Sequence, residues 1–357
     1  MVWTDLHRSH QPDAEIWLGV RTPATELPER AERIRESLVA AGAAVVEAKA
    51  HSDEAVLAVH DRALLDHLAG AWDEWREAGL TERPGQDQVV PYVFPHAAML
   101  GDQRPRSAAA IGARAGQFAY DTMTLIGPGT WEAARAGAGA ALTATELVLD
   151  GEPVAYACCR PPGHHATRTG FGGSCYLNNA AVAAARLHDG LGGRVGVIDI
   201  DAHHGNGTKT IFYEDSSVLA GSVHVDPGAG WFPHFLGFED EIGIGEGAGA
   251  NRNLCLGPGA GDGPWLSAVA TLCDWARDRG ATGLVVALGV DAAGGDPESP
   301  LQVSAEGFRE AGRLLGELCL PTVVVQEGGY DLERIGGLVV EALAGIEQGA
   351  AQPQTGQ

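Results

Sequence analysis

The chain has 357 residues, of which 45% are hydrophobic and 20% are charged, the composition of an ordinary globular protein. Its formal net charge of -23 leaves no basic stripe to neutralise phosphates, so we expect no nucleic-acid partner. No basic start is followed by an apolar segment, no apolar run reaches membrane-crossing length, and the six cysteines form no CxxC pair. We therefore expect a cytoplasmic protein with no membrane partner.

The first 150 residues are predicted to be mainly helical. The spacing of apolar residues predicts helices over 28–41, 52–59, 61–78, 109–120 and 130–149, with one short strand over 43–46. The polar start of the chain carries no predicted element. Residues 80–108 are rich in proline, glycine and glutamine and lack periodicity, and connections of this length are often functional or form interfaces.

From residue 154 onward, predicted strands alternate with predicted helices. The strands are expected over 154–159, 194–199, 218–225, 283–290 and 322–326, and the helices over 178–187, 209–213, 264–279, 305–318 and 338–346. This alternation predicts a mostly parallel sheet in a single α/β domain. We expect the domain to span 1–348 and to be followed by a frayed tail over 349–357.

The stretch from Asp199 to Thr208 is predicted to organise the functional site. A short, β-branched strand leads into two carboxylates and two imidazoles, and glycines follow. Because strand residues alternate between faces, Asp199, Asp201 and His203 project to one side. In a parallel sheet, ligands bind at the carboxyl ends of the strands. The stretch therefore predicts a metal-competent site at that edge.

The other strands of the second half also end in polar residues. The runs that follow them are Arg-Pro-Pro-Gly-His-His at 160–165, 222–227, Gly-Val-Asp at 289–291 and Glu-Gly-Gly-Tyr at 327–330. Asp201, His203 and Asp291 would supply two oxygens and one nitrogen to a metal and leave positions open, as catalytic zinc requires. Such a metal lowers the pKa of its water and polarises a carbonyl, so a metal-assisted hydrolase is predicted.

Further side chains at the same edge suit proton transfer and oxyanion stabilisation. His164 and His165 can handle protons, and Tyr330 can donate a hydrogen bond to a developing oxyanion. Gly328 and Gly329 let the backbone before Tyr330 turn sharply. A histidine pair or a tyrosine alone is weak evidence, because either packs more often than it reacts. Their convergence at one edge carries the prediction.

These motifs, in this order, resemble the zinc-dependent histone deacetylase family. The resemblance rests on the runs at 160–165, 172–179, 199–208, 289–291 and 327–330. Two more runs, Gly-Pro-Gly-Thr-Trp-Glu-Ala at 127–133 and Phe-Pro-His-Phe-Leu-Gly at 232–237, resemble the family's bacterial acetylpolyamine amidohydrolase branch. The resemblance implies a single-domain, three-layer arginase/deacetylase-like fold with a mostly parallel central sheet. It also implies a homodimer, with 80–108 as a dimer or channel segment.

The resemblance assigns roles residue by residue. The residues that match the family's catalytic set are His164, His165, Tyr330, Asp199 and Asn206, and those that match its metal ligands are Asp201, His203 and Asp291. The implied metal is one zinc ion per chain, with iron(II) as an alternative. Asp199 and Asn206 match the partners of the two histidines. A carboxylate partner is expected to raise the basicity of His164, and an amide to leave His165 less perturbed.

Structural potassium and a substrate channel are also implied by the resemblance. The residues that match a first potassium site are Asp199, Asp201, His203 and Ser222, and those that match a second, through backbone oxygens, are Phe212 and Val218. The residues that match the substrate channel are Gly173, Ser174, Phe232, Glu298 and Gly328.

The chain departs from the family's pattern at the channel. The family places an aromatic residue where this chain has Ser174, so we expect the channel opposite Phe232 to be wider or more polar. The bacterial branch places acidic residues where this chain has Gly112 and Met123. Glu298 offsets that loss, because a carboxylate at the channel mouth would attract a second ammonium group on the substrate, an attraction that salt weakens.

The predicted activity is zinc-dependent removal of acetyl from small, cationic N-acetylated amines, above all acetylpolyamines. Deacetylation of acetyl-lysine in proteins, or of an N-acetylated natural-product intermediate, is the alternative. A binuclear manganese ureohydrolase is excluded, because Gly205 and Ala293 stand where its second metal needs carboxylates. An acetyl-group sensor without activity would be expected to lack a proton-transfer residue or Tyr330, and all of these are present.

Overall fold

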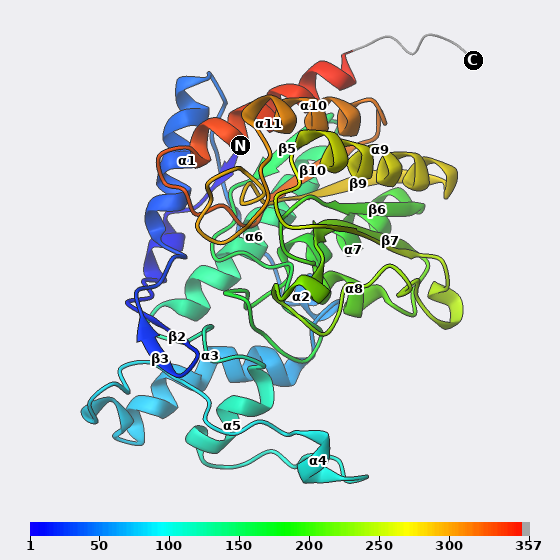
Figure 1. Ribbon diagram of the computed structural model, residues 1–357. Helices are drawn as coiled ribbons and strands as arrows, with labels where there is room; N and C mark the ends of the chain where they lie inside the picture. The colour runs from blue at the N-terminus through cyan, green and yellow to red at the C-terminus, as the bar shows by residue number, and fades with distance from the viewer. Residues whose placement is uncertain (352–357) are drawn as a thin grey trace.

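The computed structural model describes residues 1–351, and its centre is an eight-stranded sheet in which all neighbouring strands are parallel (Figure 1). In spatial order its strands are β4 (Val46–Glu47), β1 (Val2–Trp3), β5 (Val154–Ala157), β10 (Thr322–Gln326), β9 (Ala281–Leu288), β6 (Arg194–Asp199), β7 (Val218–Val225) and β8 (Asn251–Leu256). A separate antiparallel hairpin is formed by β2 (Glu15–Trp17) and β3 (Val20–Thr22). The predicted α/β fold with a mostly parallel sheet is confirmed.

Helices cover both faces of the sheet and make three layers (Figure 1). The helices are α1 (Pro28–Ala40), α2 (Glu54–Leu57), α3 (Arg62–Glu77), α4 (Ala97–Leu100), α5 (Ile111–Phe118), α6 (Thr130–Leu149), α7 (Asn179–Leu191), α8 (Asn206–Phe212), α9 (Asp262–Asp278), α10 (Ala305–Gly316) and α11 (Ile335–Ala350). Helices α6 and α7 pack on one face, whereas α9, α10, α11 and α1 lie on the other.

Successive strand residues supply two separate apolar cores. On β9, Val285 and Ala287 belong to the core beneath α6 and α7, whereas Leu284 and Val286 belong to the core on the opposite face. Both faces are covered, so the central strands are apolar throughout rather than alternating. Each fully buried aliphatic side chain contributes about 1.5–3 kcal/mol. This packing fixes the strand ends that carry the site.

Five strands differ most from the sequence prediction. The predicted strand over 43–46 is only β4, at Val46–Glu47, and β1, β2, β3 and β8 were not predicted. Strands β1 to β4 are two or three residues long, too short to show a period of two. In β8 the inward side chains include Asn251 and Asn253, whose amides donate to the loop carbonyls of Glu241 and Phe238. Because these inward positions are polar, the sequence of β8 lacks the apolar pattern of a buried strand.

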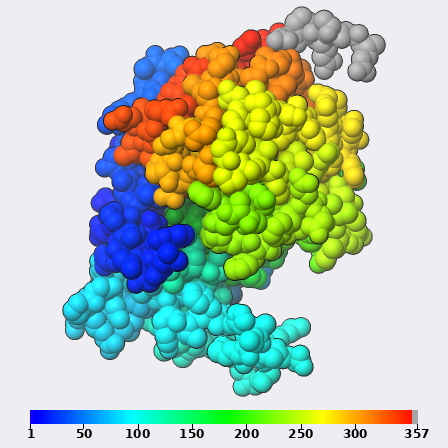
Figure 2. Space-filling view, in the orientation of Figure 1, coloured from blue at the N-terminus to red at the C-terminus, as the bar shows by residue number. Residues whose placement is uncertain are grey.

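Residues 80–108 have little regular structure, as predicted: they contain a 3-10 turn over Leu80–Glu82 and the single turn α4. Figure 2 shows this segment, in cyan, projecting from the lower edge of the molecule. At the other end, α11 continues to Ala350, two residues beyond the predicted domain end, and 352–357 of the predicted tail lie outside the described residues. Within 1–351, no helix has the length and apolar character that a membrane crossing requires.

Candidate active site

The carboxyl ends of neighbouring strands bring the predicted site together. Strands β5, β10, β9 and β6 lie side by side in this order. The segments that follow them carry the histidine pair 164–165, Tyr330, Asp291 and the stretch 199–208. Residues more than 160 positions apart in the sequence therefore meet at one edge, as expected for a parallel sheet.

Asp201, His203 and Asp291 form a compact cluster of potential ligands. One ligand atom from each lies within 4.8 Å of the others. His203 Nδ1 is 3.2 Å from Asp201 Oδ1 and 3.1 Å from Asp291 Oδ2. Backbone groups fix the carboxylates: the Gly328 N–H donates to Asp201 Oδ2 at 2.8 Å, and the Ala202 N–H donates to Asp291 Oδ1 at 2.8 Å. Both aspartates are fully buried.

The charges of this cluster fit a divalent cation. Burial and repulsion from Asp201 raise the pKa of Asp291 to about 7. Burial also opposes ionisation of Asp201, but His164 and His203 outweigh it and hold the pKa of Asp201 below its ordinary range. Two adjacent buried carboxylates need a nearby positive charge. Two carboxylate oxygens and one imidazole nitrogen form a donor set that zinc accepts, with room for further ligands.

Gly328 shows how closely the backbone approaches this cluster. A Cβ atom at Gly328 would lie 2.3 Å from Asp291 Oδ2 and 2.6 Å from Asp201 Oδ2. We expected Gly328 in the substrate channel, and its carboxylate contacts place its backbone beside the ligand cluster. Gly328 does not border the cavity, because its N–H is turned towards the buried carboxylate of Asp201.

The turn that carries Tyr330 is fixed from two sides. The Arg30 guanidinium donates to the carbonyl oxygens of Glu327, at 2.6 Å, and Gly329, and it lies 4.5 Å from the centre of the Tyr330 ring. The Tyr330 N–H donates to Asp296 Oδ2 at 2.8 Å. The same Asp296 carboxylate accepts the N–H of Glu298, at 3.0 Å, so the Tyr330 turn and the Glu298 loop are tied to one buried group.

The two histidines lie against each other, with ring centres 4.0 Å apart. His164 Nδ1 is 2.9 Å from Asp199 Oδ2, and His165 Nδ1 is 2.7 Å from Asn206 Oδ1. Asn206 is the first residue of α8, so the strand end and the following helix each place one partner. Both pairings agree with those implied by the sequence resemblance.

The surroundings of the two imidazoles shift their pKa values in opposite directions. Burial lowers the pKa of His164, but the carboxylates of Asp201 and Asp199 outweigh it and raise the pKa to about 10. Burial, together with repulsion from His164 and His203, lowers the pKa of His165 well below its ordinary value. We expected the Asn206 amide to leave His165 less perturbed than His164. Instead, burial between two other imidazoles outweighs the contact with the amide, so the pair combines a charged and a neutral imidazole.

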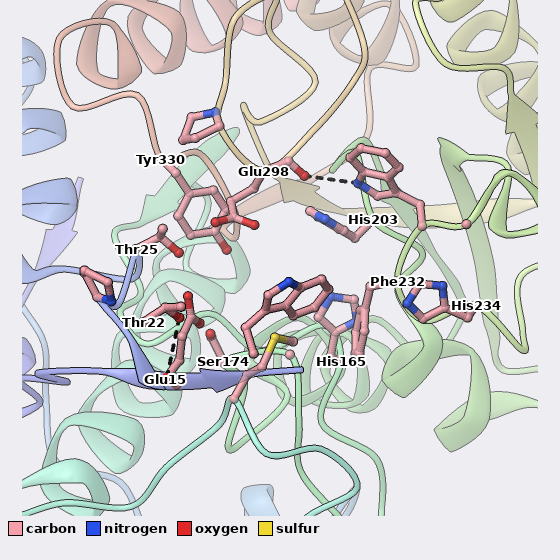
Figure 3. Close-up of a pocket in the computed structure, with 17 residues that line it drawn as sticks. Glu15, Thr22, Thr25, His165, Ser174, His203, Phe232, His234, Glu298 and Tyr330 are labelled. Carbon is pink, nitrogen blue, oxygen red and sulfur yellow. Dashed lines mark hydrogen bonds between the residues drawn. The ribbon is translucent and has the colours of Figure 1, made fainter. Parts of the chain in front are cut away.

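A cavity of about 430 Å³ opens onto these groups (Figure 3). The residues that line it are Glu15, Trp17, Thr22, Pro23, Thr25, Met123, His165, Gly173, Ser174, His203, Gly230, Trp231, Phe232, His234, Pro297, Glu298 and Tyr330. Gly173 packs closely against two of these lining residues: a Cβ atom at Gly173 would lie 2.3 Å from His165 and 2.9 Å from Phe232, so only glycine fits at this position.

Two carboxylates border the outer part of this cavity. Figure 3 shows Glu15, on the hairpin, and Glu298, near Tyr330, with their side chains directed into the same space. Burial, with repulsion from Glu298 and Asp121, raises the pKa of Glu15 to about 7. Sequence reasoning identified Glu298 and missed Glu15. No local pattern marked Glu15, because the strand that carries it has only three residues.

The residues matched to potassium sites are only partly brought together. Asp199 and Ser222 border a small buried cavity of about 10 Å³, whereas Asp201 and His203 do not border it. Ser222 Oγ is 2.8 Å from His224 Nδ1. At the second matched position, the carbonyl oxygen of Phe212 accepts the N–H of Asp215 at 3.0 Å, and Val218 begins β7.

A parallel α/β sheet that gathers such a donor set beside two histidines and a tyrosine is typical of a metal-dependent hydrolase. The family model of the histone deacetylase domain matches residues 24–346. The chain belongs to the histone deacetylase family, a family of hydrolases that act on amide bonds.

Individual relatives place the chain within this family. It is 38% identical over 347 residues to an acetylpolyamine amidohydrolase of Mycoplana ramosa, which covers 97% of this chain and 99% of the relative. It superposes on an acetylpolyamine aminohydrolase from Burkholderia pseudomallei with a TM-score of 0.90 at 35% identity, covering 98% of each chain. A histone deacetylase-like amidohydrolase of Pseudomonas aeruginosa is 38% identical over only 240 residues, 64% of this chain and 62% of the relative. The predicted resemblance to the bacterial acetylpolyamine branch is confirmed.

Proposed function

We propose that this protein is a zinc-dependent amidohydrolase that removes the acetyl group from small N-acetylated amines, above all acetylpolyamines. The proposal rests mainly on one arrangement: His165, His203 and Tyr330 border the same narrow cavity, above the buried carboxylates of Asp201 and Asp291. The two acetylpolyamine hydrolases that the chain resembles over nearly its whole length support the same substrate class.

The histidine pair is suited to move the proton. When bound, the metal would polarise the acyl carbonyl and lower the pKa of a water molecule. The Asn206 amide oxygen only accepts, so His165 Nδ1 donates to it and His165 Nε2 is left without a proton. His165 therefore acts as the base and then returns the proton to the leaving amine. The carboxylates of Asp201 and Asp199 raise the pKa of His164, which favours a positive charge beside His165.

Tyr330 is suited to stabilise the oxyanion. Burial raises the pKa of its hydroxyl well above the ordinary value, even though Arg30 acts in the opposite direction. The hydroxyl thus remains a hydrogen-bond donor at neutral pH. Arg30 and Asp296 hold the turn that carries it, so the donor is positioned before substrate arrives.

The cavity mouth favours a cationic chain. Glu15, on β2, and Glu298, in the loop after β9, both border the cavity. The chain as a whole carries a net charge of -23. A linear amine that enters this cavity would place its acetyl group at the histidines and a second ammonium near the carboxylates. Protein acetyl-lysine would leave these carboxylates without a partner.

We further propose that one catalytic domain spans 1–348 and that two copies pair through 80–108, whose exposed Tyr92 and Met99 suit an interface. Potassium is proposed near Asp199 and Ser222, where a buried carboxylate borders a small buried cavity. We propose that the protein is located in a reducing cytoplasm, because all six cysteines are free. Iron(II) in place of zinc is a variant of the same mechanism.

Metal analysis and a substrate panel test the proposed function. We expect one zinc or iron per chain and a higher kcat/KM for N-acetylputrescine or N-acetylspermidine than for an acetyl-lysine peptide. Loss of one proton-transfer or oxyanion group lowers kcat by about 100-fold or more. We therefore expect kcat to fall by this factor in His165→Ala and in Tyr330→Phe, while both variants retain the metal. A higher kcat/KM for the peptide would reject the polyamine assignment, and variants as active as the parent would reject the assigned roles.

A further inference from the structure

The two walls of the cavity differ in how much aromatic surface they carry. On one side, Trp231 and Phe232 supply aromatic surface from the loop after β7. On the other side, the fold supplies Gly173 and Ser174, whose φ angles are 57° and 60° and whose side chains are absent or small. This turn therefore supplies little apolar surface to the cavity beside His165.

Apolar surface on that side comes instead from the β2–β3 hairpin. Glu15 and Trp17 are two residues apart on β2, so their side chains project from the same face of the strand, and both border the cavity. Trp17 is 48% exposed, while Val20 on β3 is 62% exposed and does not border the cavity. A hairpin this small is not stable alone, so its position depends on its anchor.

The anchor is the segment 121–124. The Ile16 N–H donates to the Thr122 carbonyl at 3.3 Å, and the Thr122 hydroxyl donates to the Ile16 carbonyl at 2.9 Å. These two bonds fix the residue between Glu15 and Trp17, so the strand face that carries both side chains stays turned towards the cavity.

The same segment holds the turn on the cavity wall. The Gly173 N–H donates to Asp121 Oδ2 at 2.6 Å, and the Ser174 N–H donates to Thr124 Oγ1 at 2.8 Å. The hairpin and the Gly173–Ser174 turn are thus bound to one short stretch of chain. Their relative position is set by backbone-directed hydrogen bonds rather than by loose surface packing.

We propose that Trp17 is a specificity-determining residue: its indole forms the wall opposite Phe232 and, with Glu15, a subsite for the charged amine end of the substrate. An aromatic face attracts an alkylammonium group, and the same face packs against the methylenes before it. Glu15 supplies the countercharge from the same strand face. This inference rests on the proposed function and adds to it the residue that selects a cationic chain.

A matched pair of substrates tests this role. N-acetylputrescine and N-pentylacetamide have the same chain length and differ only in whether the far end is an ammonium or a methyl group. We expect Trp17→Leu to raise KM for N-acetylputrescine about tenfold, with kcat changed less than twofold, and to affect N-pentylacetamide much less. Trp17→Phe should keep most of the preference for N-acetylputrescine over N-pentylacetamide. Leu18→Ala, at the exposed turn of the same hairpin and outside the cavity, serves as the control and should match the parent.

The possible results separate this inference from the proposed function. Equal losses for both substrates, or no loss for either, would overturn the role of Trp17 while leaving the deacetylase assignment in place. A parent enzyme that hydrolyses no N-acetylated amine would instead reject the proposed function. Thermal unfolding of each variant shows whether the hairpin remains docked, and Trp17→Phe keeps the test decisive if Trp17→Leu does not fold.

Discussion

Glu327 is a fully buried carboxyl group that supports the backbone before the histidine pair. Its Oε2 accepts the N–H of Gly163 at 2.6 Å and the N–H of His164 at 3.0 Å. Burial raises the pKa of Glu327 to about 7, although the charge on His164 acts against it. The residue touches no part of the cavity lining, so we interpret it as a positioning residue for His164 and, through it, for His165.

Two substitutions of Glu327 distinguish hydrogen bonding from charge. Glu327→Gln keeps an oxygen that can accept both N–H groups, and we expect kcat to fall less than tenfold. Glu327→Leu leaves two buried N–H groups unpaired, at a cost of about 1–3 kcal/mol each, and should lower kcat by about 100-fold with KM nearly unchanged. Steady-state kinetics and metal content measure this. A Leu variant with parental kcat would contradict the positioning role.

Glu15 predicts a pH dependence of substrate binding. Its pKa of about 7 means that the carboxyl loses its proton as the pH rises from 6 to 8. The resulting carboxylate attracts an ammonium group, so KM for N-acetylputrescine should fall severalfold over this range. KM for N-pentylacetamide should stay level, and Glu15→Gln should remove the pH dependence for the diamine. If the Gln variant keeps the same KM profile, another group is titrating.

At the scale of elements, the loop between β7 and β8 forms the aromatic wall of the cavity and is tied down at Glu241. The Glu241 carboxylate pairs with the Lys209 ammonium of α8 and accepts the Gly237 N–H at 2.9 Å. The Gly237 carbonyl oxygen lies 2.8 Å from His224 Nε2 on β7. Because α8 also carries Asn206, the ion pair connects the channel wall to the element that orients His165.

Breaking the ion pair between Glu241 and Lys209 should loosen the loop that forms the aromatic wall of the cavity. Glu241→Gln leaves the Lys209 ammonium, only 9% exposed, without a countercharge, and a cost of about 3–5 kcal/mol is expected for such a loss. We expect a lower melting temperature and a raised KM, with a smaller change in kcat. Adding Lys209→Met removes the unpaired charge and should recover part of both losses. Additive effects of the two substitutions would argue against the coupling.

Sequence patterns predicted the long elements well and the short ones poorly. The helix over 130–149 and the strands over 194–199, 218–225 and 322–326 coincide with α6, β6, β7 and β10, because each repeats its pattern over enough residues or is rich in valine and isoleucine. The β2–β3 hairpin was missed because three residues show no periodicity. Its place beside the cavity depends on contacts between Ile16 and Thr122, which no local pattern records.

The same distinction holds for the site. Residues at strand ends, such as Asp201 and Tyr330, could be predicted because a parallel sheet brings such ends together. Glu15 and Trp17 could not, since their contribution depends on where an isolated hairpin docks. Arg30 and Glu327 act from behind the site through backbone contacts, and the sequence carries no signal for such contacts.

At the scale of the whole molecule, buried histidines couple folding to pH. Burial lowers the pKa of His67 to about 4, with a smaller effect from Arg114, and similar values hold for His10 and His60. His67 stacks on Phe118 with ring centres 4.5 Å apart, and neither of its nitrogens has a hydrogen-bond partner within residues 1–351. An apolar ring would fill this position equally well.

The histidines predict that acid destabilises the fold. The folded pKa of His67, about 4, lies below its unfolded value near 6.5, so the unfolded chain binds more protons between these values. Stability is therefore complete above pH 6.5 and is lost as the pH falls towards 4, by up to about 3 kcal/mol for this residue. His67→Phe should make the melting temperature less sensitive to pH between 7 and 5, measured by thermal unfolding. His96→Phe, at an exposed site, should retain the parental sensitivity. An unchanged pH dependence in His67→Phe would mean that His67 is already charged in the folded protein, and that its contact with Phe118 tolerates the charge.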